Sequence, residues 1–157
     1  MPEEVQKAME EAAGSFVDLH QLQRSVGERL AELTHNEAAY VSCGAASGLL
    51  LASAACISRH TPDAYEDFSK LDGIPNEVIV QRMHRNSYDY AVREAGAKMV
   101  EIGSMEGTRI EDLECALSPE TVAIFWFQGA MNSPSELSLE EVIHSANKHK
   151  VPVNVDA

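Results

Sequence analysis

Residues 122–127, Val-Ala-Ile-Phe-Trp-Phe, form an unbroken apolar run, which is the pattern of a strand covered on both faces. A helix is predicted after it over 138–149, and the alternating valines of 151–155 predict another strand. Parallel strands are joined by helical crossovers of about this length. The stretch from 122 to 155 therefore predicts part of a parallel α/β sheet.

The same alternation continues toward the N-terminus. Further strands are predicted at 77–81 and 98–102, and a polar loop over 59–76 precedes the first of them. In the N-terminal part, the sequence predicts a helix over 3–33 that breaks near Gly14, a short strand over 37–42 and a helix over 45–58. Two more helices are predicted between the later strands. One covers 86–94 and ends at Gly96, and the other covers 108–117 and opens with a Thr-x-x-Glu capping box. The helix over 45–58 is apolar on nearly every side, so we expect it to be buried.

The fold class that these elements predict is α/β, with a mostly parallel sheet and helices on both faces. We expect an N-terminal helical segment over 1–36, followed by an α/β domain over 37–157 whose sheet is incomplete at one edge. In open sheets of this kind, ligands bind in the crevice at the carboxyl ends of the strands. Polar residues at those ends are therefore the candidate site residues.

The composition argues against several classes of function. A net charge of −13 over 157 residues disfavours a nucleic-acid or anionic-membrane partner, because Lys and Arg supply most phosphate binding. The three cysteines and the scattered histidines have no metal-ligand spacing, so no metal site is predicted, and an odd number of cysteines fits a reducing compartment. No signal peptide opens the chain, and its longest apolar-rich run, 45–57, is too short to span a bilayer. We expect a soluble, cytoplasmic protein.

A turn of small residues, Ser42-Cys-Gly-Ala-Ala-Ser-Gly48, leads into the helix over 45–58. Small side chains at Gly44, Ala45 and Ala46 would let a phosphate approach the backbone, and a helix N-terminus offers N–H groups and the positive end of the helix dipole. The string is neither a dinucleotide-binding glycine motif nor a Walker loop. A tight turn that uses small residues for steric reasons alone explains it equally well.

Two polar residues, His84 and Arg85, follow the strand over 77–81. At the carboxyl end of a strand, the ring of His84 could lie over a planar ligand, and Arg85 could pair with an anion. The alternative is that Asn86 or Ser87 caps the next helix while His84 and Arg85 face water.

Asp156 ends the last predicted strand, and Gln128 follows the strand over 122–127. A carboxylate at this edge could keep a protonated ring nitrogen charged, and Gln128 could form a hydrogen bond with a ring substituent. The alternative for Asp156 is the cap of a following helix. The acidic residues of 136–141 indicate the start of a helix rather than paired catalytic carboxylates.

Taken together, these segments resemble fold-type-I pyridoxal-phosphate enzymes, and more narrowly the selenocysteine-synthase-like group that includes D-glucosaminate-6-phosphate ammonia-lyases. The resemblance covers essentially the whole chain, and its order and spacing are more specific than any single motif. The segments that carry it are Ser15-Phe-Val-Asp-Leu-His-Gln-Leu-Gln, Glu37-Ala-Ala-Tyr-Val-Ser-Cys-Gly-Ala-Ala-Ser-Gly-Leu, Ala54-Ala-Cys-Ile, Gln81-Arg-Met-His-Arg-Asn-Ser-Tyr-Asp and Val151-Pro-Val-Asn-Val-Asp-Ala.

The resemblance implies a role for each candidate residue. Gly44, Ala45 and Ala46 would hold the phosphate of pyridoxal 5'-phosphate. His84 would stack on its ring, Asp156 would bind the ring nitrogen, and Gln128 would lie near the ring hydroxyl. The bound ring would then act as an electron sink.

The resemblance also implies a lysine that forms the Schiff base with the cofactor, at a position beyond residue 157. We therefore expect this chain to be the N-terminal part of the large domain, to contain no catalytic residue of its own and to be inactive alone. The implied reaction is elimination of ammonia and water from an amino-sugar acid phosphate, in a homo-oligomer in which residues 3–33 pack on a partner. One alternative is a selenium transferase that acts on seryl-tRNA, which the acidic charge disfavours. The other is a binding or assembly module, which fits the lack of a lysine at the carboxyl end of a central strand.

Overall fold

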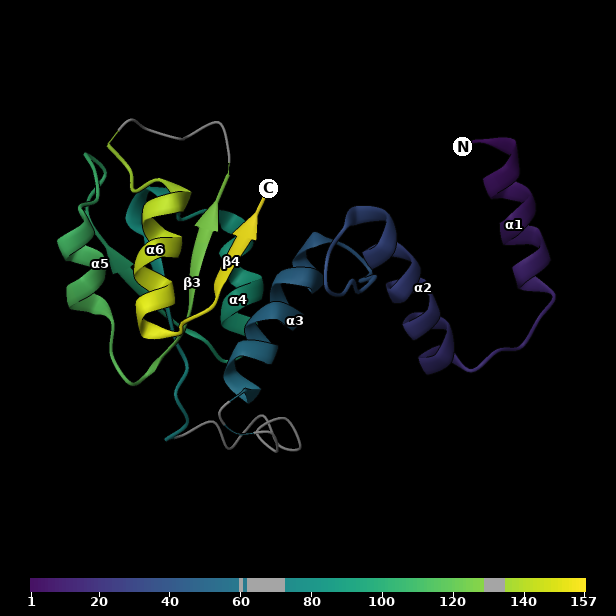
Figure 1. Ribbon diagram of the computed structural model, residues 1–157, viewed down its shortest axis with the longest axis horizontal. Helices are drawn as coiled ribbons and strands as arrows, with labels where there is room; N and C mark the ends of the chain where they lie inside the picture. The colour runs from purple at the N-terminus through teal and green to yellow at the C-terminus, as the bar shows by residue number, and fades with distance from the viewer. Residues whose placement is uncertain (60, 62–72, 129–134) are drawn as a thin grey trace. The chain divides into compact units, whose positions relative to one another are not determined.

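Two compact units make up the chain in this computed structural model, which describes residues 1–59, 61, 73–128 and 135–157. We call them the N-terminal unit, Met1–Cys43, and the sheet unit, Gly44–Ala157. Figure 1 shows their helices and strands. No helix within the described residues combines the length and the apolar character that crossing a membrane requires.

The sheet unit contains a four-stranded sheet in which every neighbouring pair is parallel. The strands lie in the order β2-β1-β3-β4. Their bounds are β1 Glu77–Gln81, β2 Lys98–Ile102, β3 Thr121–Phe127 and β4 Val153–Asp156. Because all four strands run the same way, their carboxyl ends meet at one edge, as the sequence predicted for 77–81, 98–102, 122–127 and 151–155.

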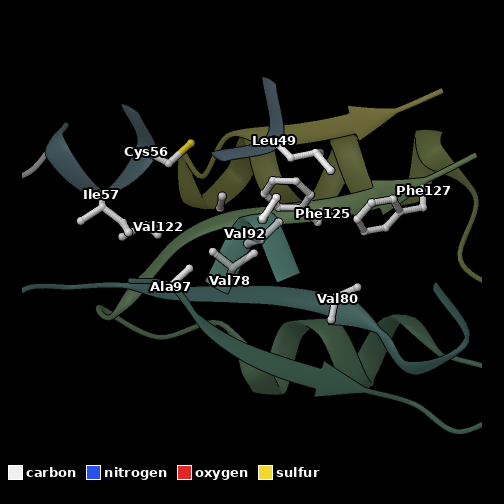
Figure 2. Close-up of a cluster of buried hydrophobic side chains, with 12 residues drawn as sticks. Leu49, Cys56, Ile57, Val78, Val80, Val92, Ala97, Val122, Phe125 and Phe127 are labelled. Carbon is white, nitrogen blue, oxygen red and sulfur yellow. The ribbon is translucent and has the colours of Figure 1, made fainter. Parts of the chain in front are cut away.

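Helices pack on both faces of this sheet, which confirms the predicted α/β class. On one face lie α3, Ala45–Ser58, and α4, Tyr90–Glu94; on the other lie α5, Ile110–Ala116, and α6, Leu139–His149. All seven residues of β3 are buried, as expected for a central strand. Figure 2 shows Phe125 of β3 among Leu49 of α3, Val92 of α4 and Val78 of β1.

The N-terminal unit consists of α1, Glu3–Ala13, and α2, Leu19–Thr34, so the predicted break near Gly14 is present. Asp18 caps α2, because its side chain accepts a hydrogen bond of 2.9 Å from the N–H of Gln21. Within residues 1–43 only Gly27 and Ala31 are buried. This unit therefore has almost no hydrophobic core of its own.

The predicted strand over 37–42 is wrong. These residues form an irregular segment that lies along α2. A Cβ at Gly27 would lie 2.4 Å from the carbonyl oxygen of Ala39, and Gln23 Nε2 donates to the carbonyl oxygen of Val41 at 2.9 Å. The segment thus contacts α2 through one close backbone approach and one side-chain hydrogen bond, and the large side chains of Tyr40 and Val41 are exposed.

The expectation that α3 is buried is met only on one face of the helix. Leu49, Cys56 and Ile57 are buried against the sheet, but Leu51 is 42% exposed. The helix is apolar all round, yet the described residues cover only the face that meets the sheet.

Two other helices begin later than the sequence indicates. The segment predicted as one helix over 86–94 starts with a 3-10 turn, Ser87–Asp89, which the side chain of Asn86 caps at 2.8 Å from the N–H of Tyr88. The predicted Thr108 capping box is shifted by one residue, because the N–H of Arg109 donates to the carboxylate of Asp112 at 2.9 Å. Thr108 is buried instead and does not cap the helix.

Candidate functional site

A cavity of about 300 Å³ lies between the start of α3 and the end of β4, both in the sheet unit. Its lining residues are Ala45, Gly48, Leu49, Ala52, Phe125 and the strand residues Val153, Asn154, Val155 and Asp156. Two of the candidate residues from the sequence, Ala45 and Asp156, therefore line the same space. Its walls are apolar at Leu49, Ala52 and Phe125 and polar where Asp156 ends the strand.

The turn before α3 depends on glycine at position 44. Gly44 is the N-cap residue and has a φ of 147°, a conformation that other L-residues rarely adopt. Its carbonyl oxygen accepts the N–H of Gly48 at 3.0 Å, which starts the helical hydrogen bonds. Ala45 and Ala46 then form the first turn, whose N–H groups have no acceptor within the helix. Of these three residues, Ala45 lines the cavity.

Asp156 is held in place by the backbone of the sheet. It is the last residue of β4 and pairs in register with Phe127 of β3. Its carbonyl oxygen accepts the N–H of Gln128 at 2.7 Å, so Gln128 lies next to the cavity edge with its own side chain exposed. This pairing fixes the backbone from which the Asp156 carboxylate projects.

A thiol–amide contact lies along the same cavity wall. Asn154 Nδ2 is 3.6 Å from the Sγ of Cys56, and Cys56 is 8% exposed. Burial raises the pKa of the Cys56 thiol, so we expect it to be protonated and unreactive at neutral pH. Cys56 is thus a core residue and not a nucleophile of the site.

His84 lies at the carboxyl end of β1, in a 3-10 turn formed by Arg82–His84, and its side chain is 2% exposed. Its Nε2 is 2.8 Å from Oε2 of Glu136, and its Nδ1 is 3.2 Å from the backbone N–H of Phe127. The ring of Trp126 meets it edge to face, with the centroids 5.4 Å apart. The alternative in which His84 faces water is therefore wrong. His84 lies beside the strand residue that pairs with Asp156, but it does not line the cavity.

Arg85 is engaged by carboxylates of its own chain. Its guanidinium group contacts the carboxylates of Asp89 and Glu101. Arg93 Nε also donates a hydrogen bond to the Asp89 carboxylate, at 3.3 Å. The hydrogen bond to Asp89 is the main cause of the raised pKa of Arg85. A substrate anion at Arg85 would have to compete with these carboxylates.

Sequence reasoning missed the segment opposite His84. Gln81, at the end of β1, forms two hydrogen bonds with the backbone of Leu137: its Oε1 accepts the N–H at 2.8 Å and its Nε2 donates to the carbonyl oxygen at 3.2 Å. Trp126 Nε1 donates to the same oxygen at 3.2 Å. These bonds place Glu136 beside His84. No local pattern could show this pairing, because the partners lie far apart in the sequence.

The described residues contain no group of three or more His, Cys, Asp or Glu side chains that could hold a metal ion. The polar groups at the cavity instead suit an organic anion with a basic ring. The start of α3 offers N–H groups for a phosphate, and the Asp156 carboxylate offers a partner for a protonated nitrogen.

The fold defines the class of protein. It is similar to the aminotransferase fold, fold type I of the pyridoxal-phosphate enzymes, and the chain matches less than half the length of the solved structures that share this fold. The structure of an aspartate aminotransferase from Thermotoga maritima matches 97% of this chain and 41% of its own, with a TM-score of 0.60 and 19% identity, which shows the fold alone.

Particular relatives are more similar in sequence. The chain is 28% identical to a D-glucosaminate-6-phosphate ammonia lyase of Salmonella typhimurium, over 98% of this chain and 43% of the relative. A solved structure of D-glucosaminate-6-phosphate ammonia-lyase matches 100% of this chain and 44% of that one, with 28% identity and a TM-score of 0.90. The chain is also 30% identical to a 5'-C-glycyluridine monooxygenase-decarboxylase of a Streptomyces species, over 96% of this chain and 40% of the relative.

The chain spans less than half the length of the curated relatives that it matches. No family model matches it. The resemblance to fold-type-I enzymes of the D-glucosaminate-6-phosphate ammonia-lyase kind is nevertheless confirmed, by sequence and by structure.

Proposed function

We propose that this chain is the cofactor-binding part of a pyridoxal-phosphate-dependent lyase that acts on an amino-sugar acid phosphate, in which water is first eliminated and then consumed by hydrolysis, so that ammonia and a 2-keto product are released. One observation carries the proposal: the first residue of α3 and the last residue of β4 line a single cavity, in a chain homologous to such a lyase. At about 300 Å³, the cavity is at the lower end of the size range of small-molecule sites.

Gly44, Ala45 and Ala46 bind the cofactor phosphate in this proposal. The absence of large side chains leaves room for phosphate oxygens next to the backbone N–H groups of the first turn. The dipole of α3, a helix of 14 residues, places partial positive charge at the same end. This part of the site needs no lysine or arginine to hold the anion.

Asp156 binds the ring nitrogen and keeps it protonated, because a close carboxylate favours the charged form. When bound, the cofactor supplies an electron sink for the bonds that break at the substrate. Gln128, exposed at the same sheet edge, donates a hydrogen bond to the ring hydroxyl. The backbone pairing between β3 and β4 places the backbones of these two residues side by side.

His84 packs a face of its imidazole against the cofactor ring, and Arg85 attracts the substrate anion. The hydrogen bonds of His84 are made by its ring nitrogens and lie in the ring plane, so they do not compete with stacking. Since the side chain is 2% exposed, stacking requires neighbouring groups to shift. Arg85 must exchange at least one of its carboxylate partners for the substrate.

We further propose that the protein acts in the cytoplasm, on a small molecule, as a homo-oligomer. The net charge of −13 disfavours tRNA as a partner and with it the selenium-transferase alternative. The equally similar glycyluridine enzyme makes a second substrate class worth testing.

The test is reversible binding of pyridoxal phosphate to the purified chain, followed by absorption and by quenching of Trp126, which is the only tryptophan. We expect Asp156→Asn to weaken binding about tenfold to a hundredfold, since a hydrogen bond to a charged group contributes about 1.5–3 kcal/mol. Glu120→Gln, an exposed acid at the amino end of β3, is the matched control and should bind as the unchanged protein does. Absence of saturable binding, or equal binding by the Asp156 variant, would refute the proposal.

The substrate class needs a separate assay. The cofactor-saturated protein is mixed with D-glucosaminate 6-phosphate or with 5'-C-glycyluridine, and the absorption of the cofactor is recorded. We expect a saturable spectral change with the sugar acid phosphate. A change with the nucleoside alone would reassign the substrate while leaving the cofactor site intact.

A further inference from the structure

Among the described residues of the sheet unit, the most enclosed acid–base pair is formed by His84 and Glu136. Their side chains are 2% and 9% exposed, and Nε2 and Oε2 are 2.8 Å apart. A carboxylate with so little access to water is costly unless a partner donates a hydrogen bond to it. Here the only side chain hydrogen-bonded to Glu136 among the described contacts is the imidazole.

The hydrogen bond at Nδ1 of His84 determines which ring nitrogen carries the proton of the neutral imidazole. The backbone N–H of Phe127 donates to Nδ1 at 3.2 Å. An amide N–H can only donate, so Nδ1 must accept and carries no proton. The proton of a neutral ring is therefore on Nε2, where it is donated to the Glu136 carboxylate. The geometry defines one tautomer of His84.

The carboxylate is itself held by rigid elements. Leu137, the next residue, is bound through its N–H and carbonyl groups to Gln81 of β1 and through its carbonyl to Trp126 of β3. Ser138 then caps α6, with its Oγ 3.3 Å from the N–H of Glu141. The segment that carries Glu136 is thus anchored at two strands and one helix.

We propose that Glu136 is a positioning residue that fixes the tautomer and the ring plane of His84. This inference rests on the proposed function, in which the His84 ring stacks on the cofactor. The imidazole forms two hydrogen bonds through its ring nitrogens, and its plane is at 85° to the ring of Trp126. These contacts together allow the ring one orientation. A neutral ring also avoids the repulsion that an imidazolium would exert on a ring nitrogen that Asp156 keeps protonated.

The tautomer is tested first, without cofactor. Long-range nitrogen–proton NMR of the full chain distinguishes a protonated from an unprotonated ring nitrogen, and His84→Gln identifies the signals. We expect Nδ1 of His84 to be unprotonated and Nε2 protonated. Glu136→Gln keeps an acceptor oxygen and should preserve this pattern, whereas Glu136→Ala should give a mixture of tautomers. A proton on Nδ1 in the unchanged protein, or no effect of Glu136→Ala, would overturn the inference.

Cofactor binding is measured second, by Trp126 quenching with pyridoxal phosphate. We expect Glu136→Ala to weaken binding about tenfold, Glu136→Gln to restore most of it, and Glu140→Ala, an exposed acid close by, to have no effect. Normal binding by a folded Glu136→Ala protein would refute the positioning role while the Asp156 result still supported the cofactor site. Loss of the Asp156 effect, with the tautomer intact, would instead refute the proposed function.

Discussion

At the scale of single residues, Glu77 joins three parts of the sheet unit through its side chain. One carboxylate oxygen lies 2.7 Å from Nζ of Lys98 on β2, and the other accepts the hydroxyl of Ser118 at 3.1 Å. The hydrogen bond from Lys98 is the main reason why the pKa of Glu77 is below its ordinary value. A carboxyl group with a lowered pKa in the folded state stabilises that state when it is ionised.

This contribution should depend on pH in a defined direction. It is present above the ordinary pKa that the glutamate has in the unfolded chain and is lost as the pH falls through the lower pKa of the folded state. We expect Glu77→Gln to lower the free energy of unfolding near neutral pH and to differ less from the unchanged protein at about pH 3. Urea unfolding at both pH values measures this. Glu106→Gln, an exposed loop acid, is the control, and a difference that stayed constant with pH would contradict the assignment.

At the scale of elements, α6 shows how its own sequence sets the start of a helix. Ser138 Oγ accepts the N–H of Glu141 at 3.3 Å, and the Glu141 carboxylate accepts the N–H of Ser138 at 2.9 Å. This reciprocal pair satisfies two N–H groups that the helix cannot. The hydrogen bond from the Ser138 backbone is also the first cause of the lowered pKa of Glu141.

Removing the cap should destabilise the sheet unit modestly. We expect Ser138→Ala to lower the free energy of unfolding by about 1 kcal/mol, the usual cost of replacing a capping serine with alanine. Ser138→Thr keeps the hydroxyl and should recover most of the loss. Both changes are measured by urea unfolding monitored by circular dichroism. Equal stability of the alanine variant would mean that tertiary packing alone holds the start of α6.

The elements that the sequence predicted well are those whose signal is local. The apolar run of β3 and the Ser-x-x-Glu start of α6 each lie within a few residues, and both were placed correctly to within one residue. The segment 37–42 carried a strand-like pattern, but it packs on Gly27 of α2 instead. A strand needs a neighbour for its backbone, and a local pattern cannot show whether one exists.

The candidate site likewise contains one pairing that the sequence could predict and one that it could not. Ala45 and Asp156 could be brought together from the sequence, because the carboxyl ends of parallel strands share one edge. The pairing of His84 with Glu136 could not, since it depends on the return of the chain after β3. The acidic residues of 136–141 correctly indicated the start of a helix. They gave no sign that one of them, Glu136, contacts His84.

At the scale of the whole molecule, the N-terminal unit exposes an apolar helix face. Phe16, just before α2, is fully exposed, and Leu19 is 74% exposed at its start. The exposed apolar residues of α2 recur at helical spacing, namely Leu19, Leu22, Val26 and Leu33. A groove of about 690 Å³ runs beside them, between α2 and residues 37–40. Contiguous apolar surface of this kind usually marks a contact with another protein chain.

We therefore expect the chain to self-associate through this face, with a second copy covering the helix. Sedimentation velocity over a range of concentrations should show a dimer or larger species that Leu19→Ser combined with Leu22→Ser converts to a monomer. Gln21→Ser, on the polar side of α2, is the matched control and should leave association unchanged. A monomer at every concentration would contradict this expectation.

The net charge of the chain allows a second, independent test of that association. Each copy carries a net charge of −13, so two copies repel one another over long range. Added salt screens this repulsion, with a Debye length that falls from about 10 Å at 0.1 M to about 3 Å at 1 M, while apolar contacts persist. We expect the association constant to rise with sodium chloride concentration, because burial of the α2 face drives the contact. An association that weakened with salt would instead indicate an interface held by ion pairs, and the α2 face would lose its assigned role.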